Sequence, residues 1–387
     1  MRGLALDLWD EASGELLAKR GAPAWGLGDP QSAPPWGAEE NIRPIRTYLE
    51  CRSALTHPQM ASQIDNRSLR QSDSNLVFLD GRRHKRLRSV LNRVLPDPRA
   101  ATASSNRFVE GLLEGLPAYA QIDIVGDFAV PIAQDMALNV LGLPRNDHSH
   151  MASLLSSMSV QFDPASDHAA LADATDAVGE FLSCIRLAVR RRAYSSGGGL
   201  DQLNRARIAG ELTLREMLGS SMLLAHASFQ NSVNALSFAA VESLTNPLVN
   251  NVMKTAGPTR QGQCIEELLR LGSPARLLGR RAHEETTIGS TPIAEEDLVI
   301  LFLGEANRDP TVFDRPDHFD DSGNRKGHLA LGAGTHLCLG AALARGELRS
   351  AIRGLTNKYA TLTFDSVTWG TNMVMFGPTS LVVELGA

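Results

Sequence analysis

The sequence has few cysteines, and they show no paired spacing. Cys51, Cys184, Cys264 and Cys338 are scattered along 387 residues, without the short interval of a Cys-x-x-Cys metal site. Scattered thiols of this kind are typical of a reducing compartment rather than of a disulfide framework. We therefore exclude a small disulfide-stabilised scaffold and a zinc site built from paired cysteines.

Long apolar runs and a strong excess of one charge are also lacking. No uninterrupted apolar stretch reaches membrane-spanning length, and Asp7 and Asp10 interrupt the apolar N-terminal residues before a signal-peptide core can form. The formal net charge is −5 and 43% of the residues are hydrophobic, which is ordinary for a soluble globular protein. We expect a soluble, cytoplasmic protein with no membrane or nucleic-acid partner.

A convincing interdomain linker is absent as well. The best candidate, Ser-Ser-Gly-Gly-Gly at 195–199, is short enough to be a loop between helices. Although the length exceeds the usual range of one domain, we expect residues 1–387 to form a single domain.

Helical patterns dominate from about residue 81. The capping-box sequence Thr213 to Glu216 starts a segment without proline until Pro247, so one helix of up to about 33 residues could span roughly 50 Å. Residues 1–80 are expected to be irregular. Further helices are expected at 81–95 and 127–141, and strands only at 286–293, 298–303 and 380–384. The pattern predicts a mainly α fold with small β-sheets and a long central helix.

Three glycines surround Cys338 in the sequence His-Leu-Ala-Leu-Gly-Ala-Gly-Thr-His-Leu-Cys-Leu-Gly, which ends at Gly340. Glycine permits a tight loop with exposed backbone, and the helix formers that follow place the cysteine just before a helix N-terminus, which favours a thiolate. A single thiolate is the axial ligand of haem iron where dioxygen is split. The alternative is that Cys338 is merely a small buried hydrophobic residue.

The loop resembles the cysteine-ligand signature of the cytochrome P450 superfamily, Phe-Gly-x-Gly-x-His/Arg-x-Cys-x-Gly, except that Leu331 replaces the phenylalanine. The resemblance extends from about residue 75 to the C-terminus; the first 70 residues match only loosely. It implies the P450 fold, a helix-rich triangular prism. It also implies haem b as cofactor, with Cys338 as iron ligand and Gly340 in the cofactor loop.

Other positions match the family's motifs. Glu267 and Arg270 resemble its Glu-x-x-Arg pair, and Arg308 resembles the third member of that structural network. The family's contacts to the haem carboxylates correspond to His84, Arg88, Arg280 and His336. His84 and Arg88 belong to the helix expected at 81–95. Other basic residues of that helix, among them Arg82, Lys85, Arg86 and Arg93, are expected either to be a solvated face or to receive an acidic donor such as a ferredoxin.

The long helix departs from the family pattern of Ala/Gly-Gly-x-Asp/Glu-Thr-Thr. The corresponding segment starts at Ala227 and has Ser228, Gln230, Asn231 and Ser232 where the family has Gly, acid, Thr and Thr. Monooxygenation consumes two protons, which an acid–alcohol pair relays, but neither Gln230 nor Asn231 can supply a proton near neutral pH. Ser228 or Ser232 could order water instead, or the substrate could supply its own hydroxyl or carboxylate to the relay.

The resemblance implies an oxidoreductase acting on a small organic molecule in specialised metabolism, such as antibiotic biosynthesis. The reaction is expected to be hydroxylation, or coupling, cyclisation or desaturation without oxygen insertion. Two alternatives remain: a peroxide-driven peroxygenase, and a catalytically silent protein that binds haem and ligand or recruits a partner. The expected partners are a ferredoxin and its reductase, and the protein is expected to be a monomer.

Substrate-facing segments follow only from the resemblance. They are 64–79, 154–187, 224–232, 276–279 and 373–376. Within them, Arg276 lies among apolar neighbours and could pair with a substrate carboxylate, or more simply be solvated or bound to a backbone carbonyl.

Overall fold

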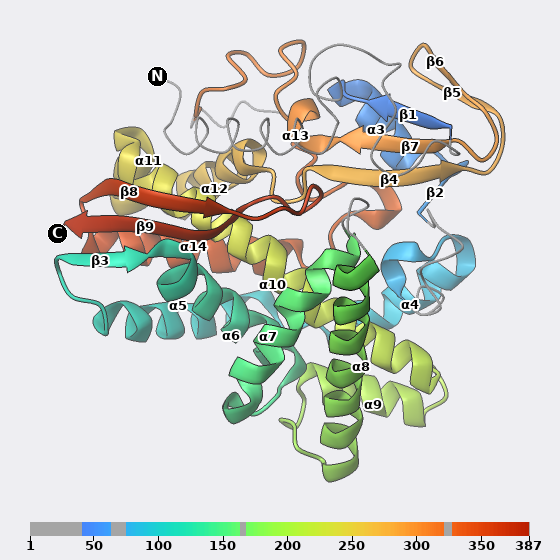
Figure 1. Ribbon diagram of the computed structural model, residues 1–387, viewed down its shortest axis with the longest axis horizontal. Coiled ribbons are helices and arrows are strands. Elements are labelled where there is room, and N and C mark those ends of the chain that lie inside the picture. The colour runs from blue at the N-terminus through green and yellow to red at the C-terminus, as the bar shows by residue number, and fades with distance from the viewer. Residues whose placement is uncertain (1–40, 63–74, 163–167, 321–326, 387) are drawn as a thin grey trace.

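The computed structural model describes residues 41–62, 75–162, 168–320 and 327–386. Its helices and helical turns are α3 (Tyr48–Thr56), η2 (Leu76–Phe78), α4 (Gly81–Val94), α5 (Pro98–Glu114), η3 (Ile124–Ala129), α6 (Val130–Leu141), η4 (Arg145–Asp147), α7 (His148–Met158), η5 (Ser159–Phe162), α8 (His168–Arg191), α9 (Gly199–Ile208), α10 (Leu214–Thr245), α11 (Pro247–Thr255), α12 (Pro258–Gly272), α13 (Leu303–Ala306), η6 (Gly334–His336) and α14 (Ala341–Lys358). Helices make up most of the structure (Figure 1), as the sequence predicts.

The strands of the described residues form three small sheets. They are β1 (Ile42–Ile45), β2 (Met60–Ala61), β3 (Ala120–Asp123), β4 (Leu277–Ala282), β5 (Thr286–Ile288), β6 (Thr291–Ile293), β7 (Leu298–Phe302), β8 (Thr361–Trp369) and β9 (Pro378–Gly386). The sheet orders are β1-β7-β4-β2, β3-β9-β8 and β5-β6. The β1–β7 pair is parallel and the other pairs are antiparallel.

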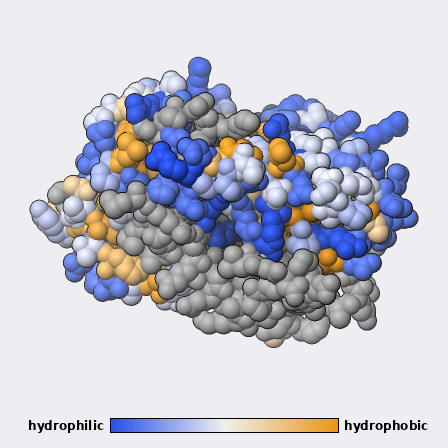
Figure 2. All heavy atoms as spheres, turned by 90° about the horizontal axis from the view of Figure 1, so that it is seen from above, coloured by the Kyte–Doolittle hydropathy of each residue, from blue (hydrophilic) through white to orange (hydrophobic). Residues whose placement is uncertain are grey.

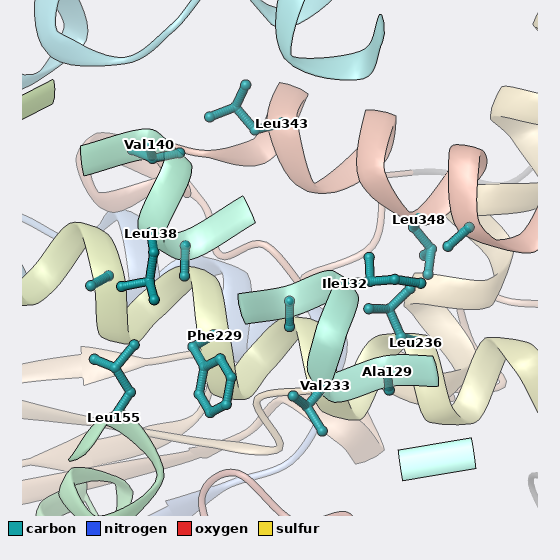
Figure 3. Packing of buried hydrophobic residues seen from close by; sticks show 14 of the residues in the cluster. Ala129, Ile132, Leu138, Val140, Leu155, Phe229, Val233, Leu236, Leu343 and Leu348 are labelled. Carbon is teal, nitrogen blue, oxygen red and sulfur yellow. The ribbon is translucent and has the colours of Figure 1, made fainter. Parts of the chain in front are cut away.

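The central helix α10 has the start and length that its sequence predicts. The Thr213 side chain accepts a hydrogen bond from the Glu216 amide while Glu216 reaches back to the Thr213 amide, so the capping box is complete. The helix runs for 32 residues and ends before Pro247, which starts α11. In the core, Leu236 of α10 lies near Ile132 of α6 and Leu348 of α14, and Phe229 of α10 lies near Leu155 of α7 (Figure 3). Helix α10 thus serves as the scaffold of the main core.

Two sequence predictions are wrong. Residues 42–61 are not irregular, because β1, α3 and β2 lie there, and β1 gains its partner from β7, more than 250 residues later. Strands also extend beyond the three expected pieces: β8 pairs with β9, β4 pairs with β7, and 286–293 is a hairpin that turns at Gly289. The pairing of β1 with β7 in particular depends on a distant partner, which local patterns do not report.

The helical stretch Ile124–Leu141 is long and apolar enough by length and composition to cross a membrane. However, 67% of it is buried inside the fold, as in the core helix of a globular protein. Among the coloured residues in Figure 2, hydrophilic side chains predominate and the apolar ones form small separate groups. The apolar character of this helix is therefore explained by core packing.

Candidate functional site

A largely apolar cavity lies where the middle of α10 faces the loop before α14. Leu224 and Ala227 of α10 and Leu331 of the loop contribute to its apolar lining. Its polar lining comprises His84, Arg88, Ser228, Asn231, Ser232, Arg280, His336, Cys338 and Glu347. The empty space, its open mouth included, amounts to about 1630 Å³.

Cys338 lines the cavity from a tightly folded loop. Its amide donates a hydrogen bond of 2.8 Å to the Leu331 carbonyl, and α14 begins three residues later. Gly332 and Gly334 both have positive φ, a backbone conformation that glycine adopts without steric cost. A Cβ on Gly334 would also lie 3.0 Å from the Leu55 carbonyl oxygen. Gly332 and Gly334 are thus required by the path of the loop.

The electrostatic setting of Cys338 differs from the simple expectation of a stabilised thiolate. Burial raises the pKa of the thiol, while the Gly340 amide and the positive charges of Arg345 and Arg88 act in the opposite direction. The sequence led us to expect that the N-terminus of α14 would favour the thiolate. With no cation bound, burial outweighs that effect and the pKa of Cys338 is raised. A bound metal ion would displace the proton, because thiolate is the form that coordinates metals.

A single protein ligand suits haem iron better than a free metal ion. The described residues contain no group of three or more His, Cys, Asp or Glu side chains arranged to hold a metal. Haem supplies the other four ligands from its own ring, so one thiolate completes its protein ligation.

Basic side chains converge on one side of the cavity. His84 and Arg88 come from α4, Arg280 from β4 and His336 from the cysteine loop, and all four line the cavity. The rings of His84 and His336 lie 4.2 Å apart between centroids. These residues, taken from three distant parts of the chain, are therefore brought together as the sequence resemblance implies.

Part of this basic cluster is buried with few hydrogen-bond partners among the described residues. His84 is 2% exposed, and its Nε2 atom has no hydrogen-bond partner among the described residues. Arg280 is also buried; it donates to its neighbour's carbonyl at Gly279 (2.8 Å), and burial lowers its pKa to about 10. Buried cationic and polar groups need an anionic or hydrogen-bonding partner, and the two carboxylates of haem would supply it.

The other two members of the cluster are held by the protein. His336 Nε2 lies 2.9 Å from Ser62 Oγ and 3.0 Å from Asp80 Oδ1, and Arg88 donates a 2.7 Å hydrogen bond to the Leu337 carbonyl. These contacts fix the cysteine loop against α4. The basic cluster, the single cysteine and the largely apolar lining of the cavity fit haem b.

Glu267 and Arg270 form a buried ion pair on α12. Arg270 also donates to the carbonyls of Asn307 and Pro316, at 2.7 Å each. The described contacts of Arg308 are with the Leu271 carbonyl at 3.3 Å and with Asp317 at 3.9 Å. The network lies away from the cavity lining, which agrees with a structural role.

Residues 227–232 of α10 point their side chains in two directions, some into the cavity and one toward Ser159. Ala227, Ser228, Asn231 and Ser232 line the cavity. The hydroxyl of Ser228 donates to the Leu224 carbonyl at 2.7 Å, and the Asn231 Oδ1 atom is buried without a hydrogen-bond partner among the described residues. Gln230 instead accepts a hydrogen bond of 3.3 Å from Ser159 Oγ. The position expected to hold the family's acid is thus occupied by an amide that contacts the start of η5.

Sequence reasoning missed Glu347, which lies on α14 and lines the cavity beneath α10. Ser232 Oγ donates to Glu347 Oε2 at 2.7 Å. Burial raises the pKa of Glu347 to about 8, against the opposing hydrogen bond from Ser232. An acid in Arg-Gly-Glu on an ordinary helix carries no local signal that it is buried or that its partner is 115 residues away.

The segments that the resemblance led us to expect near the substrate contribute unequally to the cavity lining. Leu76, Val77, Leu224 and Leu278 line the cavity, whereas its lining includes no residue of the described parts of 154–187 or of 373–376. Residues 64–74 and 163–167 lie outside the described residues. Arg276 is half-buried and also outside the lining, with its guanidinium carbon 5.9 Å from the Phe376 ring centre. Direct contact of Arg276 with a molecule in the cavity is not supported.

Comparison with known proteins gives a consistent result. The family model described as cytochrome P450 matches residues 262–361. Cytochrome P450 109 of Bacillus spizizenii is 31% identical over 81% of this chain and 78% of its own length. The biotin biosynthesis cytochrome P450 of Bacillus subtilis is 29% identical over 76% and 75%. The solved structure of the Bacillus subtilis bacillaene polyketide synthase cytochrome P450 PksS superposes with a TM-score of 0.79 at 25% identity, covering 89% of this chain and 90% of that one.

Proposed function

Since the chain belongs to the cytochrome P450 superfamily and binds haem b, we propose that it oxidises a small organic intermediate of specialised metabolism. The observation that carries the proposal is the placement of Cys338 in the cavity wall, in a loop tied to Leu331 and followed by α14. Similarity to a polyketide synthase P450 supports the substrate class. We further propose that residues 1–387 form one monomeric, cytoplasmic domain.

Each group of residues has a distinct part in this proposal. Cys338 binds the iron, and His84, Arg88, Arg280 and His336 hold the haem carboxylates through charge-assisted hydrogen bonds. The pair of Glu267 and Arg270, together with Arg308, braces the chain that leads into the cysteine loop. Bound haem with one thiolate ligand supplies the dioxygen and one-electron chemistry.

The cavity favours a mainly apolar substrate. Most of its lining is aliphatic, and sites of this kind fix orientation with a few polar groups. The unpartnered Oδ1 of Asn231 is one such group, and it would accept a hydrogen bond from a hydroxyl or amine of the substrate. A purely hydrocarbon substrate would leave this acceptor unsatisfied, at a cost of about 1–3 kcal/mol.

Whether oxygen is inserted depends on how protons reach the cavity. Gln230 points to Ser159 and neither it nor Asn231 can ionise, so the usual acid–alcohol relay is absent at these positions. Hydroxylation therefore needs another proton source. Coupling, cyclisation or desaturation needs no inserted oxygen atom.

The cofactor assignment is tested by an absorption spectrum of the reduced protein with carbon monoxide. A strongly red-shifted Soret band in the wild type and its loss in Cys338→Ala are expected. A Cys264→Ala variant is the matched control, because Cys264 is a buried thiol of α12 outside the cavity. A red-shifted band that persists in Cys338→Ala would disprove the ligand assignment.

The reaction type is tested by supplying ferredoxin, its reductase and NADPH in one assay and hydrogen peroxide in another, under labelled dioxygen. Label in the product of the first assay indicates monooxygenation. Product without label indicates oxidation without insertion, and product only with peroxide indicates a peroxygenase. Tight ligand binding with no product under any oxidant would instead support the silent binding protein.

Electron delivery is proposed to use the exposed side of α4, although the basic surface there is smaller than the sequence suggests. Arg86 pairs with Glu216 and Arg93 pairs with Glu211, so these two charges are partly compensated. Arg82 and Lys85 are exposed. An Arg82→Glu/Lys85→Glu variant is expected to raise the ferredoxin concentration needed for half-maximal reduction, without changing peroxide-driven turnover.

A further inference from the structure

A second hollow, separate from the haem cavity, lies on the surface between α5 and η4. Its lining consists of Ser104, Arg107, Phe108, Gly111 and Leu112 of α5 and Arg145 of η4. None of these residues lines the haem cavity. The empty space of this groove, its open mouth included, amounts to about 730 Å³. The function proposed for the haem cavity gives the groove no role.

The groove has an elongated, apolar floor. Its α5 residues follow the spacing of one helix face, and from Ser104 to Leu112 that face extends about 12 Å at 1.5 Å per residue. Phe108 and Leu112 are half-buried and pack against the main core. Gly111 lies between them and the open space, since a Cβ built on it would meet no atom within 4 Å. The absence of a side chain at Gly111 therefore keeps the groove open.

The rim of the groove carries positive charge and free hydrogen-bond donors. The exposed Arg107 guanidinium and the Ser104 hydroxyl make no hydrogen bond or ion pair with any residue that the structure describes. Arg145 donates to Asp135 at 2.9 Å, and its guanidinium carbon lies 5.5 Å from the centre of the Phe108 ring. Because 66% of the Arg145 side chain is exposed, its other N–H groups remain available to a ligand.

The acids close to the groove do not cancel this charge. Glu110 and Glu114 of α5 and Asp147 of η4 are exposed, but all three are outside the lining. Asp135 is also outside the lining, with a side chain that is 8% exposed, and it compensates part of the charge of Arg145. The groove therefore has two guanidinium groups and an excess of about one positive charge, which suits a ligand with one negative charge.

We propose that the groove between α5 and η4 binds a small carboxylate that carries an apolar chain. Arg107 and Arg145 bind the carboxylate through charge-assisted hydrogen bonds, for which the planar guanidinium group is well shaped, and Ser104 adds a further donor. The chain lies along α5 against Phe108 and Leu112. The site is distinct from the haem cavity and does not depend on the reaction that takes place there.

The first test is calorimetric titration of the haem-loaded protein with decanoate. Phenylimidazole occupies the haem cavity throughout, and a constant Soret band shows that decanoate does not displace it. We expect one decanoate to bind per protein, more weakly as salt is added because the charges are exposed. Decanol and inorganic phosphate should each bind several-fold more weakly. Equal affinity for decanol would exclude a role for the guanidinium groups, and equal affinity for phosphate would exclude a role for the apolar floor; either result overturns the proposal.

The second test locates the bound decanoate with two variants. Gly111→Leu places a side chain in the open space and should abolish binding. Arg107→Gln should weaken binding several-fold and reduce its dependence on salt. Since the Arg107 side chain makes no described contact, this variant keeps the test decisive if Gly111→Leu folds poorly. Unchanged affinity in Arg107→Gln overturns the proposal.

Each variant has a matched control outside the groove. Gly179→Leu alters an exposed glycine of α8 at which an added Cβ would also meet no atom within 4 Å. Arg99→Gln removes another exposed arginine of α5. Both controls should bind decanoate like the wild type, and losses equal to those of Gly111→Leu and Arg107→Gln would overturn the assigned location.

These titrations are independent of turnover. A wild type that binds decanoate in the groove but oxidises no substrate with any oxidant contradicts only the proposed function. Conversely, an active wild type that binds no decanoate while phenylimidazole fills the haem cavity contradicts only the groove site.

Discussion

Arg270 donates a hydrogen bond of 2.7 Å to each carboxylate oxygen of Glu267, one turn earlier on α12. Both side chains are almost fully buried, with exposures of 1% and 3%. The remaining donors of Arg270 bind carbonyls of the segment that follows α13. In that segment, Asn307 accepts a 2.6 Å hydrogen bond from the Leu329 amide at the start of the cysteine loop. The pair therefore anchors the chain from which Cys338 projects.

Replacing Arg270 with lysine should strongly destabilise the protein. Lysine keeps the charge but cannot form the two parallel hydrogen bonds to Glu267 or reach the carbonyls at the same time, and each buried acceptor left without its donor costs about 1–3 kcal/mol. The free energy of unfolding, measured by urea denaturation of the haem-loaded protein, should fall by an amount of this order.

The matched control is Arg93→Lys, which alters an exposed ion pair with Glu211. Exposed pairs contribute roughly 0.2–1 kcal/mol, so its urea midpoint should barely move. Similar losses in the two variants would contradict the anchoring role of Arg270.

Replacing Arg280 with glutamine should accelerate haem loss. The variant removes a buried cation from the cavity wall, and a charge-assisted hydrogen bond contributes about 1.5–3 kcal/mol. We expect the rate of haem transfer to excess apomyoglobin to rise about 10- to 100-fold. Arg281→Gln is the control on the same strand, since Arg281 binds the Glu296 carbonyl outside the cavity. If both variants lose haem equally fast, Arg280 has no specific part in retention.

Features that depend only on residues close together in the chain could be predicted from the sequence. The capping box of Thr213 and Glu216, the glycines around Cys338 and the proline that ends α10 all act within a few positions. For this reason the bounds of the central helix and the existence of the cysteine loop could be predicted. The mainly α fold followed from the same local patterns.

Contacts across the chain could not be predicted in the same way. Helix α10 presents different residues to the cavity and to η5. The direction of the Gln230 side chain therefore depends on how α10 is rotated about its axis in the fold. Ser232 and Glu347 are 115 positions apart, and the burial of Glu347 arises from packing among α6, α10 and α14. Strand β1 likewise exists because β7 lies beside it.

Replacing Gly334 with alanine should damage the cysteine loop. Its φ is +67°, and an added Cβ would meet the Leu55 carbonyl and the Thr56 side chain at 3.0 Å. The backbone conformation and the close contacts together should cost about 2–4 kcal/mol and lower the haem content of the purified protein. Haem content is measured from the Soret absorbance relative to protein concentration.

Gly262→Ala provides the contrast, because that glycine lies within α12 and an added Cβ would meet no atom within 4 Å. Alanine in an open helical position should stabilise the protein by about 0.5–1 kcal/mol, with normal haem content. Normal haem content in Gly334→Ala as well would show that the loop tolerates a different backbone path.

Replacing Glu347 with glutamine should change how stability depends on pH. Burial raises the pKa of Glu347 from 4.5 to about 8, so between these values the folded protein binds a proton that the unfolded chain has released. The wild type therefore loses stability as the pH rises through this window, by about 1.4 kcal/mol for each unit of pKa difference. Glu347→Gln lacks this loss, so its advantage over the wild type in urea midpoint should grow from about pH 5 to about pH 9. Comparison within the same buffers cancels the titration of other groups. A constant difference between the two proteins across that range would mean that Glu347 is already ionised at the lower pH, and that burial does not raise its pKa in the folded protein.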